Sequence, residues 1–522
     1  MMSLLDDNKT YKKVKRNLTN TQQLKNNSMV NNWLKNNYIE KNRRDALITK
    51  DAQPPQIYGL VKTHKPDMPL RPIVSCIKSS FNKMSLFLVQ ILANIIGKSK
   101  YHIKDSFHFQ RFIKHQRVPK GYMLVSFDVV SLYTNIPVEL ALEAVENNWE
   151  KLKNLTKLPK TEFVYAVKVC LENTFFQYQD SFYQQIRGLA MGAPVSACLA
   201  NLVMEHLENE VLRKCKKSVL FYKRMVDDCL LCIRKRDVQR VLAEFNSFHP
   251  SIQFTCEVEQ NNSINFLDLT LDHSRGPKIY TKWYQKPAHS GRYLNFLSSV
   301  PYQHKINVMK NLFQRIIRLT DKCYLNESID KAKKLLGQNC YPAVLVNKLA
   351  KQCQHAERFK IKKSKPKFNV ENIVKLPYIP DLSEKLRKSL KPLGFETVFN
   401  NRNSNKSMYP ILKNKVPTHK MSNVVYQIEC NECPGKYIGQ TKRYLEDRIK
   451  SHRYDSKEVT ALHQHEREKG HTFNFQNAKV LVQEPNLRTR LIQEAIKIKR
   501  CSTAVNSRGD TSCLNAIYDQ FF

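Results

Sequence analysis

The sequence contains no apolar run long enough to cross a membrane. A membrane-spanning helix needs about 18 or more consecutive apolar residues, and no run of that length occurs in the 522 residues. The basic, asparagine-rich N-terminus also has no short apolar segment of the type that directs secretion. We therefore expect a soluble intracellular protein with no membrane partner. Its length favours two or more domains, because a single core usually stops growing below this size.

Acidic residues are scarce relative to basic ones. The chain has 46 Asp and Glu against 86 Lys and Arg, which gives a formal net charge of +40. Self-repulsion of this size destabilises a compact chain unless a polyanion shares its surface. Nucleic acid is therefore the expected partner.

The sequence also lacks the pattern of a disulfide framework. Its 14 cysteines are scattered along a chain without a secretion signal, which favours reduced thiols or a metal site. Cys430 and Cys433 have the spacing of metal ligands. We interpret the other cysteines as core residues.

No regular repeat is present, so a solenoid or propeller is disfavoured. Apolar segments, turn residues and helical stretches alternate instead, which indicates an α+β fold. The predicted parts are an N-terminal extension (1–50), a large α+β body (51–290), a helical segment (291–355, with its clearest helix at 306–319), a basic linker (356–420) and a small α/β domain (421–518).

Three aspartates form the sharpest chemical pattern in the large body. Asp128 follows a strand-like run, and Asp227 and Asp228 lie between two apolar runs, where a hairpin turn is expected. Carboxylates on two neighbouring strands supply the hard oxygen ligands that a pair of Mg²⁺ ions needs for nucleotidyl transfer. An ordinary polar turn is the alternative for the Asp pair taken alone.

Further segments surround these carboxylates in a fixed order. Residues 57–66 read Ile-Tyr-Gly-Leu-Val-Lys-Thr-His-Lys-Pro, 70–75 Leu-Arg-Pro-Ile-Val-Ser, 128–137 Asp-Val-Val-Ser-Leu-Tyr-Thr-Asn-Ile-Pro and 188–196 Gly-Leu-Ala-Met-Gly-Ala-Pro-Val-Ser. Together with Val226-Asp227-Asp228 they resemble the reverse transcriptases of the Penelope-like retroelement family. The resemblance implies a right-hand polymerase, with fingers and palm in residues 51–290 and a thumb in residues 291–355.

The resemblance also implies ligands. Asp128, Asp227 and Asp228 would bind Mg²⁺ or Mn²⁺, and the partners would be an RNA template, a DNA target and primer, and deoxynucleoside triphosphates. The nucleotide-binding candidates are basic, aromatic or backbone-permissive positions within the motifs: Lys62, Lys65, Arg71, Tyr133, Gly188, Met191 and Gly192. General nucleic-acid contact is an equal alternative for Lys62. For Tyr133 a buried aromatic is the alternative to a ring that blocks a ribose 2′-hydroxyl.

Residues 264–269 and 283–287 resemble the strand and primer-grip region of the same family. For Asp268, within the first of these segments, we rank a structural role first.

The last part of the chain has its own pattern. Val424-Val425-Tyr426 and Tyr437-Ile438-Gly439 resemble the GIY-YIG nuclease family, with two valines in place of the first Gly and Ile. Arg448 and His452 follow four residues apart, on one face of an expected helix. Glu494 on another helix and Asn515 complete the family order.

Each of these residue types suits a hydrolysis at phosphorus. A tyrosine can orient water, Arg448 can neutralise the developing charge, and Glu494 can hold one Mg²⁺. A surface helix residue is the alternative for any one of them. The candidate catalytic set is Tyr426, Tyr437, Arg448, His452, Glu494 and Asn515.

A zinc site is predicted between and after the two tyrosine motifs. Cys430, Cys433, His465 and His471 form a set that suits a closed tetrahedral shell. Penelope-like nucleases carry such an insertion, so a structural Zn²⁺ is favoured over free thiols. His463 competes with His465 as the third ligand.

These patterns together predict an RNA-directed DNA polymerase fused to a DNA-nicking endonuclease. It would act in the nucleus after cytoplasmic synthesis, in target-primed retrotransposition. A telomerase-like polymerase and a catalytically silent nucleic-acid-binding remnant are the two alternatives. The oligomeric state, the RNA copied and the DNA sequence nicked stay open.

Overall fold

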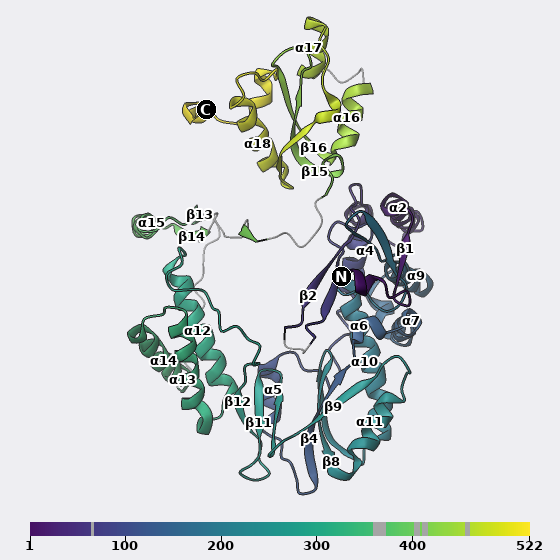
Figure 1. The fold of residues 1–522 in the computed structure, drawn as a ribbon, viewed down its shortest axis with the longest axis vertical. Coiled ribbons are helices and arrows are strands. Elements are labelled where there is room, and N and C mark those ends of the chain that lie inside the picture. Colours follow the sequence, from purple (N-terminus) through teal and green to yellow (C-terminus); the bar gives the residue numbers. More distant parts are fainter. Residues whose placement is uncertain (64–66, 359–371, 401–407, 410–415, 455–459, 522) are drawn as a thin grey trace.

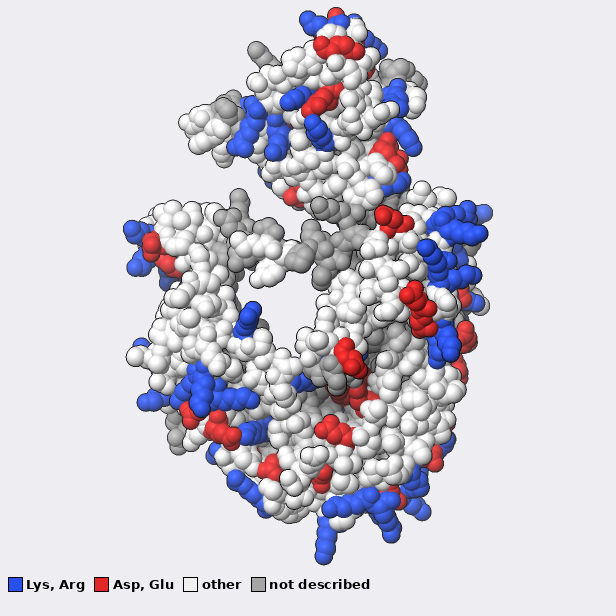
Figure 2. All heavy atoms as spheres, viewed as in Figure 1, with Lys and Arg blue, Asp and Glu red and all other residues white. Residues whose placement is uncertain are grey.

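A computed structural model describes residues 1–63, 67–358, 372–400, 408–409, 416–454 and 460–521. Three bodies follow one another along the chain, coloured purple to teal, green and yellow in Figure 1. The space-filling view is hollowed between the β2 side and the α12 side of the molecule (Figure 2). No helix in the described ranges is long and apolar enough to cross a membrane.

The first fifty residues belong to the large body. They form α1 (Met2–Leu5), β1 (Tyr11–Val14), α2 (Thr19–Lys35) and α3 (Lys41–Leu47). Strand β1 pairs with a strand more than 160 residues later, through Tyr11 opposite Gln185. Trp33 is fully buried and donates to Glu162 at 2.8 Å. The sequence suggested an extension because β1 is short and polar, and its distant partner gives no local signal.

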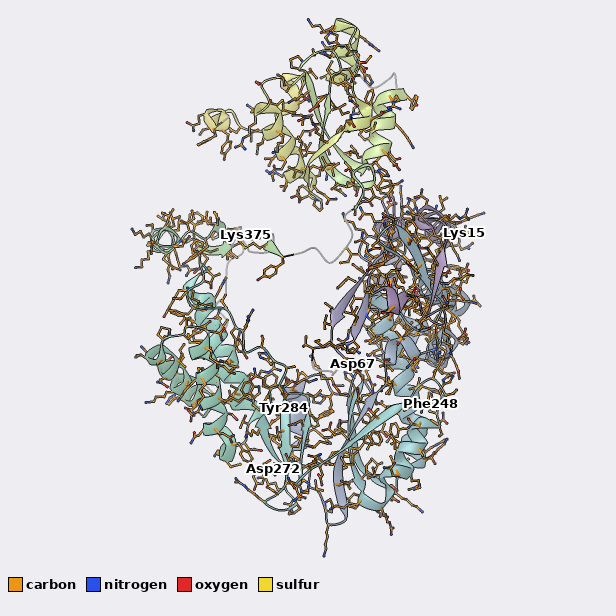
Figure 3. The ribbon with its side chains drawn as sticks, in the orientation of Figure 1. Lys15, Asp67, Phe248, Asp272, Tyr284 and Lys375 are labelled. Atoms are coloured by element: carbon orange, nitrogen blue, oxygen red, sulfur yellow. The ribbon has the colours of Figure 1, made fainter. Side chains whose placement is uncertain are left out.

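A five-stranded sheet holds this region together. Its order is β1-β6-β5-β2-β3, with β2 (Gln56–Val61), β3 (Leu70–Ser75), β5 (Phe175–Tyr178) and β6 (Ser181–Gln185). Hairpin β2–β3 projects toward the centre of the molecule (Figure 1). Asp67, near its tip, is labelled in the central part of the view in Figure 3.

A four-stranded antiparallel sheet of order β7-β8-β4-β9 forms the centre of the large body. Its strands are β4 (Tyr122–Val129), β7 (Val219–Met225), β8 (Asp228–Arg234) and β9 (Phe254–Val258). The continuous apolar run of β8 is fully buried, as expected for a central strand covered on both faces. The helices around it are α4 (Asn82–Leu92), α5 (Ser106–Ile113), α6 (Leu132–Asn135), α7 (Val138–Asn147), α8 (Trp149–Leu152), α9 (Lys160–Glu172), α10 (Pro194–Lys214) and α11 (Val238–Asn246).

A smaller sheet joins this body to the helical segment. It contains β10 (Ser263–Phe266), β11 (Leu269–Asp272) and β12 (Tyr280–Trp283), and it is followed by α12 (Tyr302–Leu319), α13 (Leu325–Gln338) and α14 (Ala343–Arg358). Phe109, Phe266 and Phe313 share one core across these elements. The helix predicted at 306–319 is confirmed, because its apolar residues recur at helical spacing and face that core.

Part of the predicted linker is folded. Strands β13 (Ile373–Pro377) and β14 (Glu396–Asn400) pair in parallel around α15 (Leu382–Leu390). The basic run at 359–367 lies outside the described residues.

The last body is a three-stranded antiparallel sheet with helices, as expected for a small α/β domain. Its order is β16-β15-β17. The elements are β15 (Ser422–Glu429), β16 (Lys436–Tyr444), α16 (Leu445–Tyr454), α17 (Ala461–Lys469), β17 (Lys479–Gln483) and α18 (Leu487–Lys499).

Candidate active site

The three predicted carboxylates converge at one end of the central sheet. Asp128 on β4 lies directly opposite Asp228 on β8 in the strand register. Asp227 stands in the turn between β7 and β8, and Met225 pairs with Asp228 across it. The hairpin turn expected from the sequence is therefore confirmed.

The electrostatics of this cluster favour a bound cation. Burial, followed by the nearby carboxylates of Asp227 and Asp128, raises the pKa of Asp228 to about 6, while Lys286 opposes them. Like charges held this close disfavour ionisation unless a cation lies between them. The donor set of three carboxylates fits hard divalent ions such as Mg²⁺ or Mn²⁺.

Tyr133 lies beside the carboxylates on the short helix α6. Burial raises the pKa of its half-buried hydroxyl, and the charge of Asp227 adds to that effect, while Arg71 lowers it. Tyr133, Asp227 and Arg71 are thus electrostatic neighbours. Arg71 is exposed on β3, which is consistent with a ligand-facing side chain.

Gly188 and Gly192 occupy positions that only glycine fits. Their φ angles are +77° and +111°. A Cβ at Gly188 would lie 2.3 Å from the Thr134 carbonyl oxygen, and one at Gly192 would lie 2.3 Å from that of Val74. Close contact with the Thr134 and Val74 backbones therefore requires glycine at both positions. The nucleotide-binding role of the two glycines stays a prediction.

Main-chain bonds fix the rest of this motif. Val74 N donates to Met191 O at 2.7 Å, and Leu189 N donates to Tyr133 O at 2.6 Å. The motif thus connects the β2–β3 hairpin to the helix that carries Tyr133. Lys62 directly follows β2 and is half-buried, and Lys65 lies outside the described residues.

Comparison with family models bears on this region. Residues 63–259 match the model described as reverse transcriptase (RNA-dependent DNA polymerase). The match spans all three carboxylates. The chain contains a reverse transcriptase domain.

A second family model matches beyond that domain. It is described as an animal helix-turn-helix domain and covers residues 292–351, which contain α12, α13 and most of α14. No curated protein matches the sequence.

Solved structures give more distant similarities. A Candida albicans telomerase bound to a fragment of telomeric RNA has a TM-score of 0.41 at 11% identity, over 65% of this chain and 62% of that chain. Apo telomerase from Candida tropicalis has a TM-score of 0.36 at 11% identity, over 63% and 62%. A BmCPV RNA-dependent RNA polymerase in its elongation state has 0.35 at 14%, over 70% and 34%. The chain thus spans less than two thirds of the length of each.

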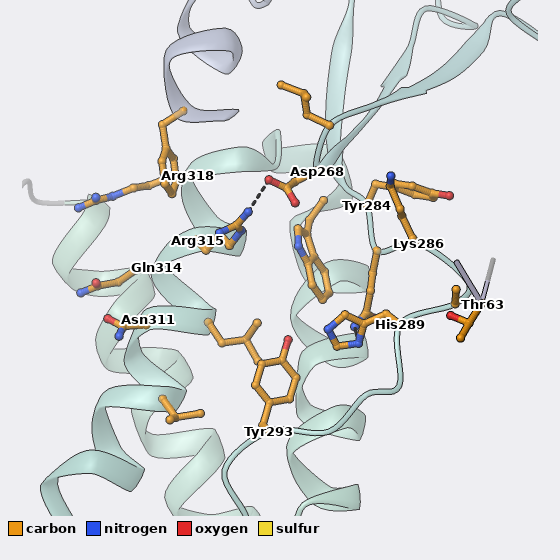
Figure 4. Close-up of a pocket in the computed structure, with 17 residues that line it drawn as sticks. Thr63, Asp268, Tyr284, Lys286, His289, Tyr293, Asn311, Gln314, Arg315 and Arg318 are labelled. Carbon is orange, nitrogen blue, oxygen red and sulfur yellow. Dashed lines mark hydrogen bonds and ion pairs between the residues drawn. The ribbon is translucent and has the colours of Figure 1, made fainter. Parts of the chain in front are cut away.

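A pocket of about 940 Å³ lies between the reverse transcriptase domain and α12. Figure 4 shows Tyr284, Lys286 and His289 on one wall, with Thr63 beyond them and the polar side chains of α12 opposite. Asp268 accepts from Ser106 Oγ at 2.5 Å and forms an ion pair with Arg315. Asp268 therefore has the structural role ranked first for it.

The polar residues that α12 contributes to this pocket were missed in the sequence. A detectable signal existed, because they recur three or four residues apart on the face opposite the apolar stripe. They are Asn311, Gln314, Arg315 and Arg318.

The C-terminal body gathers most of its predicted residues into one cluster. Tyr426 is fully buried, and its hydroxyl lies 2.6 Å from His452 Nε2. Arg448 Nε donates to the same hydroxyl at 3.3 Å. The Tyr437 and His452 rings meet edge to face, with centroids 5.3 Å apart.

Gly439 completes the fit of this cluster. It pairs with Tyr426 across β15 and β16. A Cβ on Gly439 would lie 2.8 Å from the Tyr426 hydroxyl oxygen. The glycine of the second tyrosine motif is therefore needed to seat the first tyrosine.

Glu494 on α18 faces the same cluster. Burial and the charge of Asp510 raise the pKa of Glu494 to about 7, whereas a hydrogen bond from Gln440 N and the nearby Arg448 and Arg490 lower it. A partly buried carboxylate whose ionised form is disfavoured gains stability when a cation binds it.

Asn515 is not brought to this cluster. It is exposed, and its side chain accepts from Ile517 N at 3.0 Å. Asn506 instead contacts the strand of the second tyrosine motif, because its amide donates to Ile438 O at 2.8 Å and accepts from Ile438 N at 2.9 Å. The sequence signal was the capping box of Ser507 and Asp510, which marks a fixed turn directly after Asn506.

Four potential zinc ligands come together at the edge of this sheet. The ligand atoms of Cys430, Cys433, His465 and His471 lie within 4.8 Å of one another. His465 Nε2 is 3.5 Å from Cys433 Sγ and 3.2 Å from His471 Nδ1, and Cys430 Sγ is 3.6 Å from His471 Nδ1. Ligands about 2.0 to 2.3 Å from a tetrahedral Zn²⁺ have roughly these separations, so the set fits zinc.

His465, not His463, is therefore the third member of the zinc set. His463 Nε2 lies 2.7 Å from the backbone oxygen of His452. That bond ties the helix of the zinc set to the helix of the tyrosine cluster.

Proposed function

We propose that this protein is an RNA-directed DNA polymerase coupled to a DNA-nicking endonuclease, acting in target-primed retrotransposition of a Penelope-like element. The observation that carries the proposal is the register of Asp128 opposite Asp228, with Asp227 beside them, within a reverse transcriptase domain. The buried cluster around Tyr426 supports the second activity.

Each proposed polymerase residue has a separate role, which follows from its position in the domain. Divalent ions held by Asp128, Asp227 and Asp228 would activate the primer 3′-hydroxyl and stabilise the leaving pyrophosphate. Arg71 and Lys62 offset phosphate charge of the incoming nucleotide, and Lys65 belongs to the same proposed set. Tyr133 is the proposed steric gate, a ring that would exclude a ribose 2′-hydroxyl. Arg315 and Arg318, which α12 contributes to the pocket, contact the backbone of the growing duplex in this proposal.

The nuclease residues form one hydrogen-bonded unit. Burial raises the pKa of Tyr426 far above its usual range and that of Tyr437 to about 12, so both hydroxyls stay protonated at neutral pH. In this proposal His452, which contacts the Tyr426 hydroxyl, accepts a proton from water, and Tyr426 orients that water. Arg448 neutralises charge that develops at phosphorus, and Glu494 is the residue that would hold a divalent ion.

The two activities complement each other. A nick that leaves a 3′-hydroxyl supplies the group that a polymerase must extend, and one chain then carries both steps. The target DNA places the reaction in the nucleus. A Zn²⁺ ion held by Cys430, Cys433, His465 and His471 would stabilise the fold around the proposed nuclease cluster without taking part in the reaction.

Primer extension tests the polymerase half directly. With an RNA template, an annealed DNA primer and Mg²⁺, the parent protein should synthesise DNA. Asp227→Asn should abolish synthesis and leave plasmid nicking intact, because the nuclease cluster is separate from the carboxylates. Undiminished synthesis by Asp227→Asn would remove the metal-ligand role.

The same assay separates the alternatives. A catalytically silent nucleic-acid-binding protein would retain the primer and template without extending the primer. A telomerase-like polymerase would extend DNA ends and would not nick plasmid.

A further inference from the structure

A charged pair lies in the core directly beneath the proposed metal-binding turn. Arg224 on β7 and Glu208 on α10 form an ion pair, and both side chains are fully buried. Tyr222 OH donates to Glu208 at 3.1 Å. An isolated pair of this kind is weak evidence for stability, because desolvation offsets most of the attraction between its charges. Another role is therefore needed to explain why it is there.

The remaining contacts of Arg224 point to the turn. Its NH1 donates to the Val226 carbonyl oxygen at 2.9 Å and to Asn201 Oδ1 at 3.0 Å. Val226 immediately precedes Asp227 and Asp228. One guanidinium therefore connects helix α10, through Glu208 and Asn201, to the peptide that leads into two of the three carboxylates.

That peptide has a strained backbone. Val226 has a φ angle of +59°, which a β-branched residue rarely adopts. Strain of this type persists only where the surroundings hold it, and it is typical of functional sites. A charge-assisted bond to the Val226 carbonyl is a suitable restraint, since it fixes the direction of the peptide just before Asp227.

Helix α10 is a suitable anchor because of where it begins in the chain. It begins at Pro194, directly after the glycines that approach Val74 and Thr134. The pair thus ties the turn that presents Asp227 and Asp228 to the element that follows the proposed nucleotide-positioning motif.

We propose that Arg224, anchored by Glu208, is a positioning residue that holds the Val226 peptide in its left-handed conformation and so sets the spacing of the metal-binding carboxylates. The inference rests on the proposed polymerase function for the identity of that site. It assigns Arg224 no contact with substrate.

The test replaces both charges together, because removing one leaves the other buried without a partner. In Arg224→Met/Glu208→Met the core keeps a similar volume, and such replacements of buried pairs are often neutral or stabilising. We expect a melting temperature close to that of the parent, with turnover in primer extension reduced by about 100-fold, because a misplacement of roughly 1 Å can cost that much. The Mg²⁺ concentration needed for half-maximal synthesis should rise.

Tyr222→Phe is the matched control. It removes a donor to the same Glu208 carboxylate but leaves the bond from Arg224 to Val226 in place. Its turnover and Mg²⁺ requirement should stay near those of the parent. A purely structural pair would instead affect the melting temperature of the double variant and leave its Mg²⁺ requirement unchanged.

Calorimetry of Mn²⁺ binding separates this inference from the proposed function. The variants and the parent are compared in a Glu494→Gln background, which removes the proposed metal ligand of the nuclease cluster. Weaker Mn²⁺ binding by Arg224→Met/Glu208→Met than by the parent supports the positioning role of Arg224, even if the parent synthesises no DNA. A folded double variant with parental Mn²⁺ affinity and parental turnover would overturn the inference.

Discussion

The surroundings of Asp228 disfavour the ionised form of its carboxyl group. Its pKa is raised from 3.8 to about 6 by burial and by the two neighbouring carboxylates. Because the folded pKa lies above the unfolded one, the stabilising contribution of this group is fully present below about pH 4 and is lost as pH rises through about 6. At neutral pH its ionised form therefore destabilises the metal-free fold, as expected for a ligand that a cation neutralises.

Asp228→Asn should accordingly stabilise the metal-free protein at pH 7. The free energy of unfolding should rise by about 1 to 2 kcal/mol. This figure converts a pKa shift of roughly two units into energy and lowers the result because the group is partly exposed to solvent. The gain should vanish near pH 4, where the parent carboxyl is already protonated. Denaturant unfolding at both pH values measures it, with the exposed Asp67→Asn as control. Equal effects at the two pH values would argue against this electrostatic account.

Tyr133 gives a second prediction at this scale. Tyr133→Ala should admit ribonucleotides more readily, by about 10- to 100-fold in relative incorporation, since a lost steric wall is worth roughly that much. Single-nucleotide incorporation with matched deoxy- and ribonucleotides measures the ratio. Tyr133→Phe keeps the ring and should behave as the parent. Unchanged discrimination in Tyr133→Ala would leave only a packing role for the ring.

Sequence reasoning found individual residues when a motif fixed their register. Asp128, Tyr133, Tyr426 and Glu494 were predicted this way, and their catalytic and binding roles stay predictions. Asn506 was missed because its role depends on a main-chain contact with Ile438, a residue 68 positions away. No local pattern encodes such a pairing.

At the scale of elements, periodicity decided what could be predicted. The β7–β8 hairpin and α12 were predictable, because alternating apolar runs around a polar turn and a helical apolar stripe are local patterns. Strand β1 was not predictable, since four residues with two lysines carry no strand signal until β6 supplies the partner. The folded β13–α15–β14 unit inside the expected linker was also missed, although β14 alternates exposed and buried residues.

The zinc set is the element whose loss should matter most to the C-terminal body. Metal analysis of the purified chain should give about one Zn²⁺ per molecule, as a single tetrahedral set holds one ion. Cys430→Ser should lose that ion and plasmid nicking, because metal binding and folding are coupled in such sites. Primer extension should persist. Cys513→Ser, at an exposed free cysteine, is the control, and full nicking by zinc-free protein would refute the structural role.

At the scale of the whole molecule, the two proposed catalytic bodies touch each other. Ser422 Oγ at the start of β15 donates to Asp51 at 3.0 Å, and Tyr444 OH donates to the Ala52 carbonyl. The C-terminal body is therefore held against residues 51–52, which directly precede β2. With a net charge of +40 on the chain, both bodies can share one nucleic-acid molecule.

The coupling of the two activities is the central claim, and one assay tests it. The protein is incubated with supercoiled plasmid, an RNA template and deoxynucleotides, and cDNA covalently joined to the nicked strand is measured by amplification across the junction. The parent should form this product. Glu494→Ala should form none and should still extend a pre-annealed primer, because the palm carboxylates are unchanged. Junction products from Glu494→Ala at the parental level would contradict target-primed synthesis by this nuclease.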